Sequence, residues 1–424
     1  MKTIGGRYLR SRKTHLTYFA ASLCFALQLS ANNVITDWTG IASMTIVTNG
    51  AKPSPAAAIW FAYSSLAAYD AVNAITGQYQ PFYYRVAGDL NASIDAAAAA
   101  AAHRVLVHYF PSQQITLDTQ FQTSLAAIAG DPTAKTAGVA IGEAAATALI
   151  NARVGDGLEA NIPYTPGSGP GAWIPTPPNF PNPVTPWLAQ MRPFTMRGSG
   201  DFLPAPPPAL TSETWERDYN LTRLYGGTTS TARSNAEAEI ALYWTDNPSA
   251  QYARAFNNLV QNYNLGTADS ARMMAMLWTG FADAGIGCFN AKYRYGFWRP
   301  VTAIQAGGGD SDLTADPGWL PLGTTPGHPE YPAAHGCVTG AVSSLIADFF
   351  GTPQVHILTD SIVFKDSVHQ HTFEDTRDLM DEVFWARIYA GFHYHHSLEA
   401  GRTLGESVAS QLARKYFRPR SPRN

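Results

Sequence analysis

The hydrophobic and polar positions of the chain repeat mainly at helical spacing. In eleven segments apolar residues recur every three to four positions, which is the pattern of amphipathic or buried helices. The predicted helices cover residues 55–75, 93–110, 114–129, 133–154, 211–225, 232–245, 250–263, 268–293, 334–350, 373–389 and 397–416. Strand-like alternation is scarce, and residues 355–363 are its best candidate. The pattern predicts an all-α fold of packed helical bundles with long surface loops rich in proline and glycine.

A proline- and glycine-rich stretch, residues 155–210, separates two groups of predicted helices. It closes on three consecutive prolines at 206–208, and proline removes a backbone donor that a helix needs. A segment this long without regular structure usually wraps a surface or shapes an entrance. We expect a wrapping loop between an N-terminal helical half, residues 32–154, and a C-terminal half, residues 211–424, in a single domain. A lid is the alternative role.

Seven consecutive alanines at 96–102 lie inside one predicted helix. Alanine has the highest intrinsic helix propensity, and its small side chain lets helices approach closely. We expect this helix to be buried on several sides.

The first 31 residues have the layout of a signal peptide. Five basic residues between Lys2 and Lys13 precede an apolar run at 16–29, which is followed by small residues. The run is short and interrupted for a membrane span, so an uncleaved anchor is the less favoured alternative. No later segment reaches membrane length. We expect residues 1–31 to be removed and the mature protein to be secreted or periplasmic, without membrane attachment.

The composition of the chain limits the kinds of ligand and partner that we expect it to bind. The chain has 46% hydrophobic and 14% charged residues and a net charge of -3, so it carries no basic field that would attract nucleic acid. Cys24 would leave with the signal peptide, and the two remaining cysteines exclude a cysteine-rich zinc module. Cys288 and Cys337 either form one disulfide or remain thiols. Nothing in the sequence specifies an oligomeric state, and a homo-oligomer stays open.

Two cations lie seven positions apart in the segment 292–300. On a helix, Lys292 and Arg299 would share one face, where they repel each other unless an anion or acidic side chains lie between them. The planar guanidinium of arginine suits a tetrahedral oxyanion. An ordinary solvent-exposed face is the alternative.

Two further segments carry histidines. In 326–336, His335 stands where a turn-rich approach gives way to a predicted helix, whose N-terminal N–H groups suit an anion. In 386–397, Arg387 and His393 are six positions apart. A histidine can exchange protons near neutral pH.

Other histidines suggest a metal site as an alternative. His393, His395 and His396 form one cluster, but neighbours this close in sequence rarely supply three convergent ligands. His369 and His371 form a second group, which we expect in a solvent-exposed loop.

Together the three segments resemble the signature of the vanadium-dependent haloperoxidases and the acid phosphatases of the type 2 phosphatidic acid phosphatase superfamily. That signature is K-x6-R-P, then P-S-G-H, then S-R-x5-H-x3-D. The matching residues are Lys292, Arg299, Pro300, Pro332, His335, Arg387 and His393. Gaps of roughly 35 and 50 residues between the elements also suit the superfamily. The resemblance covers residues 282–405.

The resemblance implies a pocket for vanadate, with phosphate able to occupy the same site. The lysine and the two arginines would neutralise the oxygens, and the backbone N–H of Ala334 would add a hydrogen bond. His393 would bond to vanadium through a ring nitrogen, or attack phosphorus in a phosphatase. His335 would act as acid and base. A haloperoxidase would also need hydrogen peroxide, a halide and a small organic acceptor.

Four positions depart from the signature. Ala333, Ala334 and Ala386 replace Ser, Gly and Ser, and Ser397 replaces the final Asp. The loss at Ala333 removes one hydrogen bond to the anion. The loss at Ser397 removes the carboxylate that would orient the nucleophilic histidine, which favours the haloperoxidase over the phosphatase.

Halide preference would depend on residues around the anion, for which the candidates are His328, Ala333, Phe297 and Trp298. His328 lies five positions before Ala333, where haloperoxidases that favour bromide tend to carry histidine. The resemblance therefore implies bromide or iodide in preference to chloride. Packing of His328 in a proline-rich turn is the alternative.

Three functions remain open at this point. The first is a secreted vanadate-dependent haloperoxidase, and the second is an acid phosphatase of the same superfamily with His393 as nucleophile. The third is a non-catalytic protein that binds an oxyanion.

Overall fold

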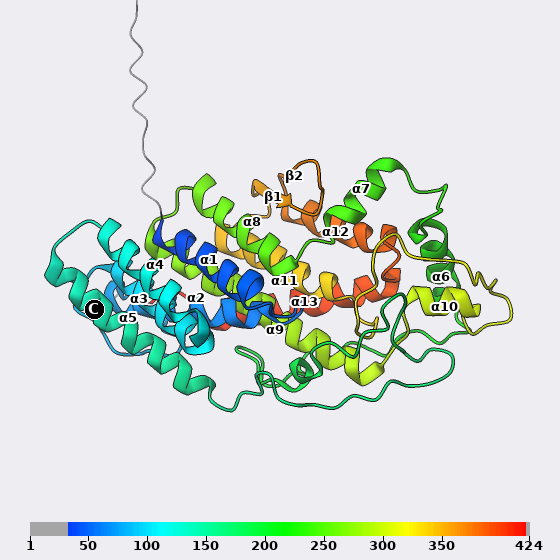
Figure 1. Cartoon of the computed structure of the whole chain (residues 1–424), viewed down its shortest axis with the longest axis horizontal. Helices are drawn as coiled ribbons and strands as arrows, with labels where there is room; N and C mark the ends of the chain where they lie inside the picture. The colour runs from blue at the N-terminus through cyan, green and yellow to red at the C-terminus, as the bar shows by residue number, and fades with distance from the viewer. Residues whose placement is uncertain (1–32, 421–424) are drawn as a thin grey trace, which may run out of the picture. The chain divides into compact units, whose positions relative to one another are not determined.

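Helices dominate the computed structural model, which describes residues 33–420. Within that range thirteen α-helices and one two-stranded hairpin occur (Figure 1). The helices are α1 (Val34–Ser43), α2 (Ala57–Thr76), α3 (Ile94–Tyr109), α4 (Gln114–Ala127), α5 (Pro132–Arg153), α6 (Glu213–Gly226), α7 (Asn235–Tyr243), α8 (Pro248–Asn262), α9 (Thr267–Tyr295), α10 (Pro300–Ala306), α11 (Ala334–Phe350), α12 (Thr376–Tyr389) and α13 (His395–Lys415). The all-α prediction is confirmed.

All eleven predicted helices are present, and two were missed. The missed helix α1 is rich in β-branched residues, which have low helix propensity, and Asn33 caps it through its side chain. The missed helix α10 has only seven residues and begins at Pro300. A π-helical turn, Met44–Asn49, continues α1.

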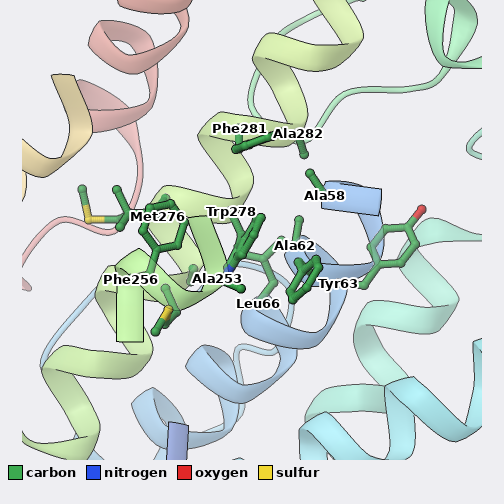
Figure 2. Packing of buried hydrophobic residues seen from close by; sticks show 14 of the residues in the cluster. Ala58, Ala62, Tyr63, Leu66, Ala253, Phe256, Met276, Trp278, Phe281 and Ala282 are labelled. Atoms are coloured by element: carbon green, nitrogen blue, oxygen red, sulfur yellow. The ribbon is translucent and has the colours of Figure 1, made fainter. Parts of the chain in front are cut away.

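The long helix α9 joins the two groups of helices. It contacts α2 of the N-terminal group and both α11 and α13 of the C-terminal group. Figure 2 shows Trp278 of α9 beside Ala62 and Leu66 of α2, with Phe256 of α8 on its other side. The rings of Phe256 and Trp278 lie 5.1 Å apart, edge to face. One hydrophobic core therefore runs through both groups.

Two helix contacts depend on small residues. All seven alanines at 96–102 are buried in α3, as expected. Helices α11 and α13 come closer still, because Gly401 and Gly405 of α13 face the backbone of α11. A Cβ at Gly401 would lie 2.6 Å from the carbonyl oxygen of Ala333, and one at Gly405 would collide with that of Cys337. This contact fixes the N-terminus of α11 beside the N-terminus of α13.

The segment 155–210 is irregular apart from a 3-10 turn, Pro186–Gln190. Its backbone bonds to distant parts of the C-terminal half: Trp173 N donates to Gly296 O at 2.7 Å, and Val184 N donates to Gly327 O at 2.9 Å. It therefore wraps the loops that precede and follow α10.

The strand candidate at 355–363 is realised as β1 (Ile357–Ser361), which pairs antiparallel with β2 (His369–Phe373). His369 and His371 thus lie on a strand, which corrects the expectation of a loop. Both rings are bonded to Glu239.

Residues 33–420 lie within one packed unit. The predicted signal peptide, residues 1–31, lies outside the described residues, and the boundary stays a prediction. No helix between residues 33 and 420 is both long and apolar enough to span a membrane.

Candidate oxyanion site

The cations and histidines predicted from the sequence lie in or close to the wall of one cavity. It has a volume of about 500 Å³ and lies where α9, α11, α12 and the turn between α12 and α13 meet. Its wall includes His328, Ala334, His335, Arg387 and His393. The other two predicted residues, Lys292 at the end of α9 and Arg299 just before α10, lie directly behind this wall. The three segments, far apart in sequence, therefore form one site.

Lys292 and Arg299 are fully buried and hold the loop that leads to His335. The Nζ of Lys292 donates to the carbonyl oxygens of Pro329 at 2.9 Å and Glu330 at 2.8 Å. The Nε of Arg299 donates to the carbonyl oxygen of His328 at 2.9 Å. Both cations thus use neutral partners for these bonds.

Arg387 is the third buried cation. Its Nη1 donates to the carbonyl oxygen of Trp244 at 2.6 Å, and its guanidinium lies 4.8 Å from the ring centre of Phe392. Its Nε is buried without a hydrogen-bond partner. Within residues 33–420, neither this arginine nor Lys292 or Arg299 forms an ion pair with a carboxylate.

Burial lowers the pKa of all three cations, and the negative charge of Glu330 offsets only part of the shifts of Lys292 and Arg299. Desolvation is the main cause and lowers the pKa of Lys292 to about 8, that of Arg387 to about 9 and that of Arg299 to about 10. The positive charge of Arg299 contributes further to the shifts of both neighbours. The charge of a bound anion would reverse these shifts, so the site favours an anionic ligand.

His335 stands in the first turn of α11 and faces the cavity. Burial lowers its pKa well below the usual value, and the charges of Arg387, Lys292 and Arg299 lower it further. Its imidazole is therefore neutral at neutral pH and able to accept a proton. The backbone N–H groups of Ala334, His335 and Gly336 have no acceptor among the hydrogen bonds of the described chain, as expected at a helix N-terminus.

His393 has a carboxylate partner that the sequence analysis missed. Its Nδ1 lies 2.7 Å from Oε1 of Glu330, and both side chains are almost fully buried. The expectation that the change at Ser397 leaves His393 without a carboxylate was therefore wrong. Burial raises the pKa of Glu330, and the nearby Ser397 hydroxyl lowers it. An acidic residue in the proline-rich approach to His335 was the only sequence signal, and its contact with His393 spans 63 residues.

His328 lies against Arg299 and the cavity. Its Nδ1 is 3.1 Å from Nη2 of Arg299, and its ring packs 5.1 Å from that of Phe289. Burial and the charge of Arg299 lower its pKa well below the usual value. This position is compatible both with the predicted role near the halide and with the packing alternative.

Three other candidates do not line the cavity. The side chains of Phe297 and Trp298 pack in a separate aromatic cluster with Trp215, where they are held by stacking and edge contacts. Ala333 is fully buried, and its N–H donates to Ser397 O at 3.0 Å. These three residues thus lie outside the cavity lining, and a role behind the lining residues stays a prediction.

The structure also bears on the disulfide and on the histidine metal site that the sequence left open. Cys288 and Cys337 are buried free thiols, so the suggested disulfide is absent. His396 bonds through Nδ1 to Asp218 at 2.8 Å and not toward His393. Within residues 33–420, no group of three or more potential ligands is arranged to hold a metal ion.

A tetrahedral oxyanion such as vanadate or phosphate fits this donor set. The site offers three buried cations without carboxylate partners, an unpartnered Arg387 Nε and the N-terminus of α11. These groups lie in or directly behind the wall of a cavity large enough for an anion and a further small molecule.

Comparisons with known proteins show what the chain is similar to. Residues 272–421 match the model of the VCPO second helical-bundle domain. Vanadium chloroperoxidase from Curvularia inaequalis is 29% identical over 252 residues, which cover 48% of this chain and 41% of that protein. The match thus spans about two fifths of the length of that relative.

Solved structures extend the likeness to most of the chain. A bacterial vanadium-dependent iodoperoxidase superposes with a TM-score of 0.76 at 23% identity, covering 92% of this chain and 97% of that one. A holo-type bacterial vanadium-dependent chloroperoxidase superposes with a TM-score of 0.67 at 16% identity, covering 93% of each chain. The chain is therefore similar to vanadium haloperoxidases in sequence and has their helical-bundle fold.

Proposed function

We propose that the chain is a vanadate-dependent haloperoxidase that oxidises halide with hydrogen peroxide. The observation that carries the proposal is the set of three buried cations, Lys292, Arg299 and Arg387, none of which forms an ion pair with a carboxylate within residues 33–420. Arg387 lines the cavity, and the other two lie directly behind its wall. Placing uncompensated charge in a protein interior is unfavourable unless a ligand of opposite charge binds there. The likeness to vanadium haloperoxidases supports vanadate as that ligand.

Vanadate, when bound, would supply the Lewis-acid centre that activates peroxide toward halide. The chain's own residues hold the anion and move protons. The three cations and the N–H groups of α11 neutralise the oxygens. His393 presents Nε2 to the site, and the neutral imidazole of His335 takes up and returns a proton. The apolar wall, which includes Phe281 and Phe289, leaves room for a small organic acceptor.

The proposal is tested with vanadate-reconstituted protein. Bromide or iodide oxidation should depend on vanadate and peroxide, and an Arg387→Ala variant should lose most of the rate. Glu399→Gln, an exposed charge change on α13, serves as a matched control and should keep it. Equal rates in the reconstituted wild type and the Arg387→Ala variant would contradict the proposal.

We further propose that bromide and iodide are preferred over chloride, on the basis of His328 in the cavity wall. Relative rates with the three halides test this preference. His328→Phe should shift the preference toward chloride, because the change replaces a polar ring with an apolar one. An unchanged order of halides in that variant would count against a role of His328.

A phosphatase is the second candidate, and the His393–Glu330 pair favours it. A carboxylate on Nδ1 makes the opposite ring nitrogen a better nucleophile, and this partner is present after all. Vanadate-free protein should then hydrolyse aryl phosphates, with inhibition by vanadate. No hydrolysis across a broad panel of phosphomonoesters would remove this candidate.

Export through the N-terminal segment also remains a proposal. Its support is the basic and apolar layout of residues 1–31. N-terminal sequencing of the protein from the cell exterior or periplasm should begin near residue 32. A mature protein that retains Met1 and stays in the cytoplasm would contradict it.

A further inference from the structure

We infer that Glu330 is the positioning residue of His393 and that it replaces, from a different segment, the acid missing at position 397. Its carboxylate holds the imidazole with a proton on Nδ1 and with Nε2 directed to the oxyanion. The inference rests on the proposed oxyanion site but not on which oxyanion is native.

Two independent contacts select the same tautomer of His393. On one side, Nη1 of Arg299 lies 3.3 Å from Nε2, and a guanidinium can only donate, so Nε2 is the acceptor. On the other side, Nδ1 lies 2.7 Å from Oε1 of Glu330. Because a neutral imidazole carries one N–H, Nδ1 donates to that oxygen. The ring nitrogen free of a proton is therefore the one nearest the cations.

A second donor fixes which carboxylate oxygen is used. The backbone N–H of Tyr394 donates to the same Oε1 of Glu330 at 3.2 Å. This amide cannot accept a hydrogen bond, so any side chain at position 330 with one oxygen and one NH₂ group will turn its oxygen toward Tyr394 and His393. A glutamine here would thus keep the acceptor for Nδ1 and lose only the charge.

The backbone of Glu330 is held as firmly as its side chain. Its N–H donates to the carbonyl oxygen of Phe297 at 2.8 Å, and its own carbonyl oxygen accepts from Nζ of Lys292 at 2.8 Å. Glu330, which lies in the loop before His335, is therefore bonded both to the segment that holds Lys292 and Arg299 and to the turn that holds His393. This is the arrangement expected of a group that orients a ligand-binding side chain.

The position that carries the acid in the signature faces the same interior. Ser397 is fully buried, its hydroxyl lies near the carboxylate of Glu330, and its carbonyl oxygen accepts from the N–H of Ala333. Removing the Glu330 side chain would open space next to it. A carboxylate introduced at Ser397 should then be able to take over the role.

The test combines nitrogen NMR of histidine-labelled protein with calorimetry of phosphate and vanadate binding. Wild type should show His393 as a single tautomer protonated at Nδ1. Glu330→Ala should show a mixture and bind the anions about tenfold or more weakly, the range typical for loss of such partners. Glu330→Gln should keep the tautomer and bind vanadate more weakly, because the imidazole loses the basicity that a neighbouring carboxylate gives it.

Rescue and control variants separate positioning from general damage. Glu330→Ala combined with Ser397→Asp should recover the tautomer and most of the affinity, whereas Glu399→Gln should match wild type. A wild-type His393 protonated at Nε2 would overturn the inference. So would Glu330→Ala or Glu330→Gln with both readouts unchanged. Neither readout requires halide oxidation, so failure of the proposed activity is seen separately.

Discussion

Buried charge is the dominant feature at the scale of single residues. Lys292, Arg299 and Arg387 use backbone carbonyl oxygens as partners, and one buried carboxylate, Glu330, bonds to His393 and not to them. A buried cation without an acidic partner destabilises a fold, because no counter-charge offsets the cost of its desolvation. The arrangement is instead suited to a ligand that brings the missing negative charge.

Replacing one of these cations should therefore affect binding and stability in opposite directions. We expect Arg387→Met to bind phosphate about tenfold or more weakly, since charged hydrogen bonds contribute roughly 1.5–3 kcal/mol each. The same variant, measured without anion, should unfold at an equal or higher urea concentration because an unpaired buried charge is gone. A variant that is less stable yet binds phosphate normally would show that Arg387 is structural.

Anion binding should be accompanied by proton uptake. The pKa of Lys292 is lowered to about 8 by burial, and that of His335 is lowered well below its usual value. A bound anion raises both values, so the complex holds more protons than the empty protein and affinity falls as pH rises from 6 to 9. Sulfate is the suitable probe because its charge is constant there. Calorimetry in two buffers of different ionisation enthalpy measures the uptake, and its absence would contradict the electrostatic description.

At the scale of elements, the contact between α11 and α13 places His335 beside the His393 turn. Helical periodicity predicted both helices, and α11 was predicted with its observed bounds of Ala334–Phe350. Their glycine-mediated approach was not predicted, because a glycine in a helical pattern does not reveal which backbone it faces. The partner of Glu330 could not be predicted either. It depends on how the loop before α11 meets the turn between α12 and α13, which the sequence does not show.

A methyl group in this contact should disturb the site from a distance. Gly405→Ala would push against the carbonyl oxygen of Cys337, and we expect a loss of about 2 kcal/mol or more of unfolding free energy. Phosphate affinity should fall as well, since α11 carries His335. Gly40→Ala is the matched control: nothing lies within 4 Å of its Cβ, so its stability should rise by up to ~1 kcal/mol. Equal behaviour of the two variants would contradict the close contact.

At the scale of the whole molecule, α9 contributes to the core of both helical groups and carries Lys292 in its last turn. Cys288 and Cys337 lie in that core as buried thiols, one on α9 and one on α11. The fold class was predicted correctly from the sequence. The signature also predicted correctly that its cations and histidines form one site. The sequence could not predict where Phe297 and Trp298 point, because an aromatic residue beside a motif packs wherever the neighbouring segments leave space.

Thiol labelling should report the opening of this core. In a Cys24→Ser variant we expect no rapid reaction in the folded state and two reactive thiols in urea without reductant. Saturating phosphate should slow the labelling, since a ligand that binds only the folded state stabilises it. Two unreactive cysteines in urea would reveal a disulfide, and rapid labelling of the folded protein would place a thiol at the surface.

The central claim is that the buried cations and His393 bind vanadate. The most direct measurement is the vanadium content of the purified, vanadate-treated protein together with its X-ray absorption spectrum. The account predicts one vanadium per chain with an imidazole nitrogen ligand, which disappears in His393→Ala, and loss of the metal itself in Arg387→Ala. Protein that retains no vanadium, or that retains it equally in both variants, would contradict the account.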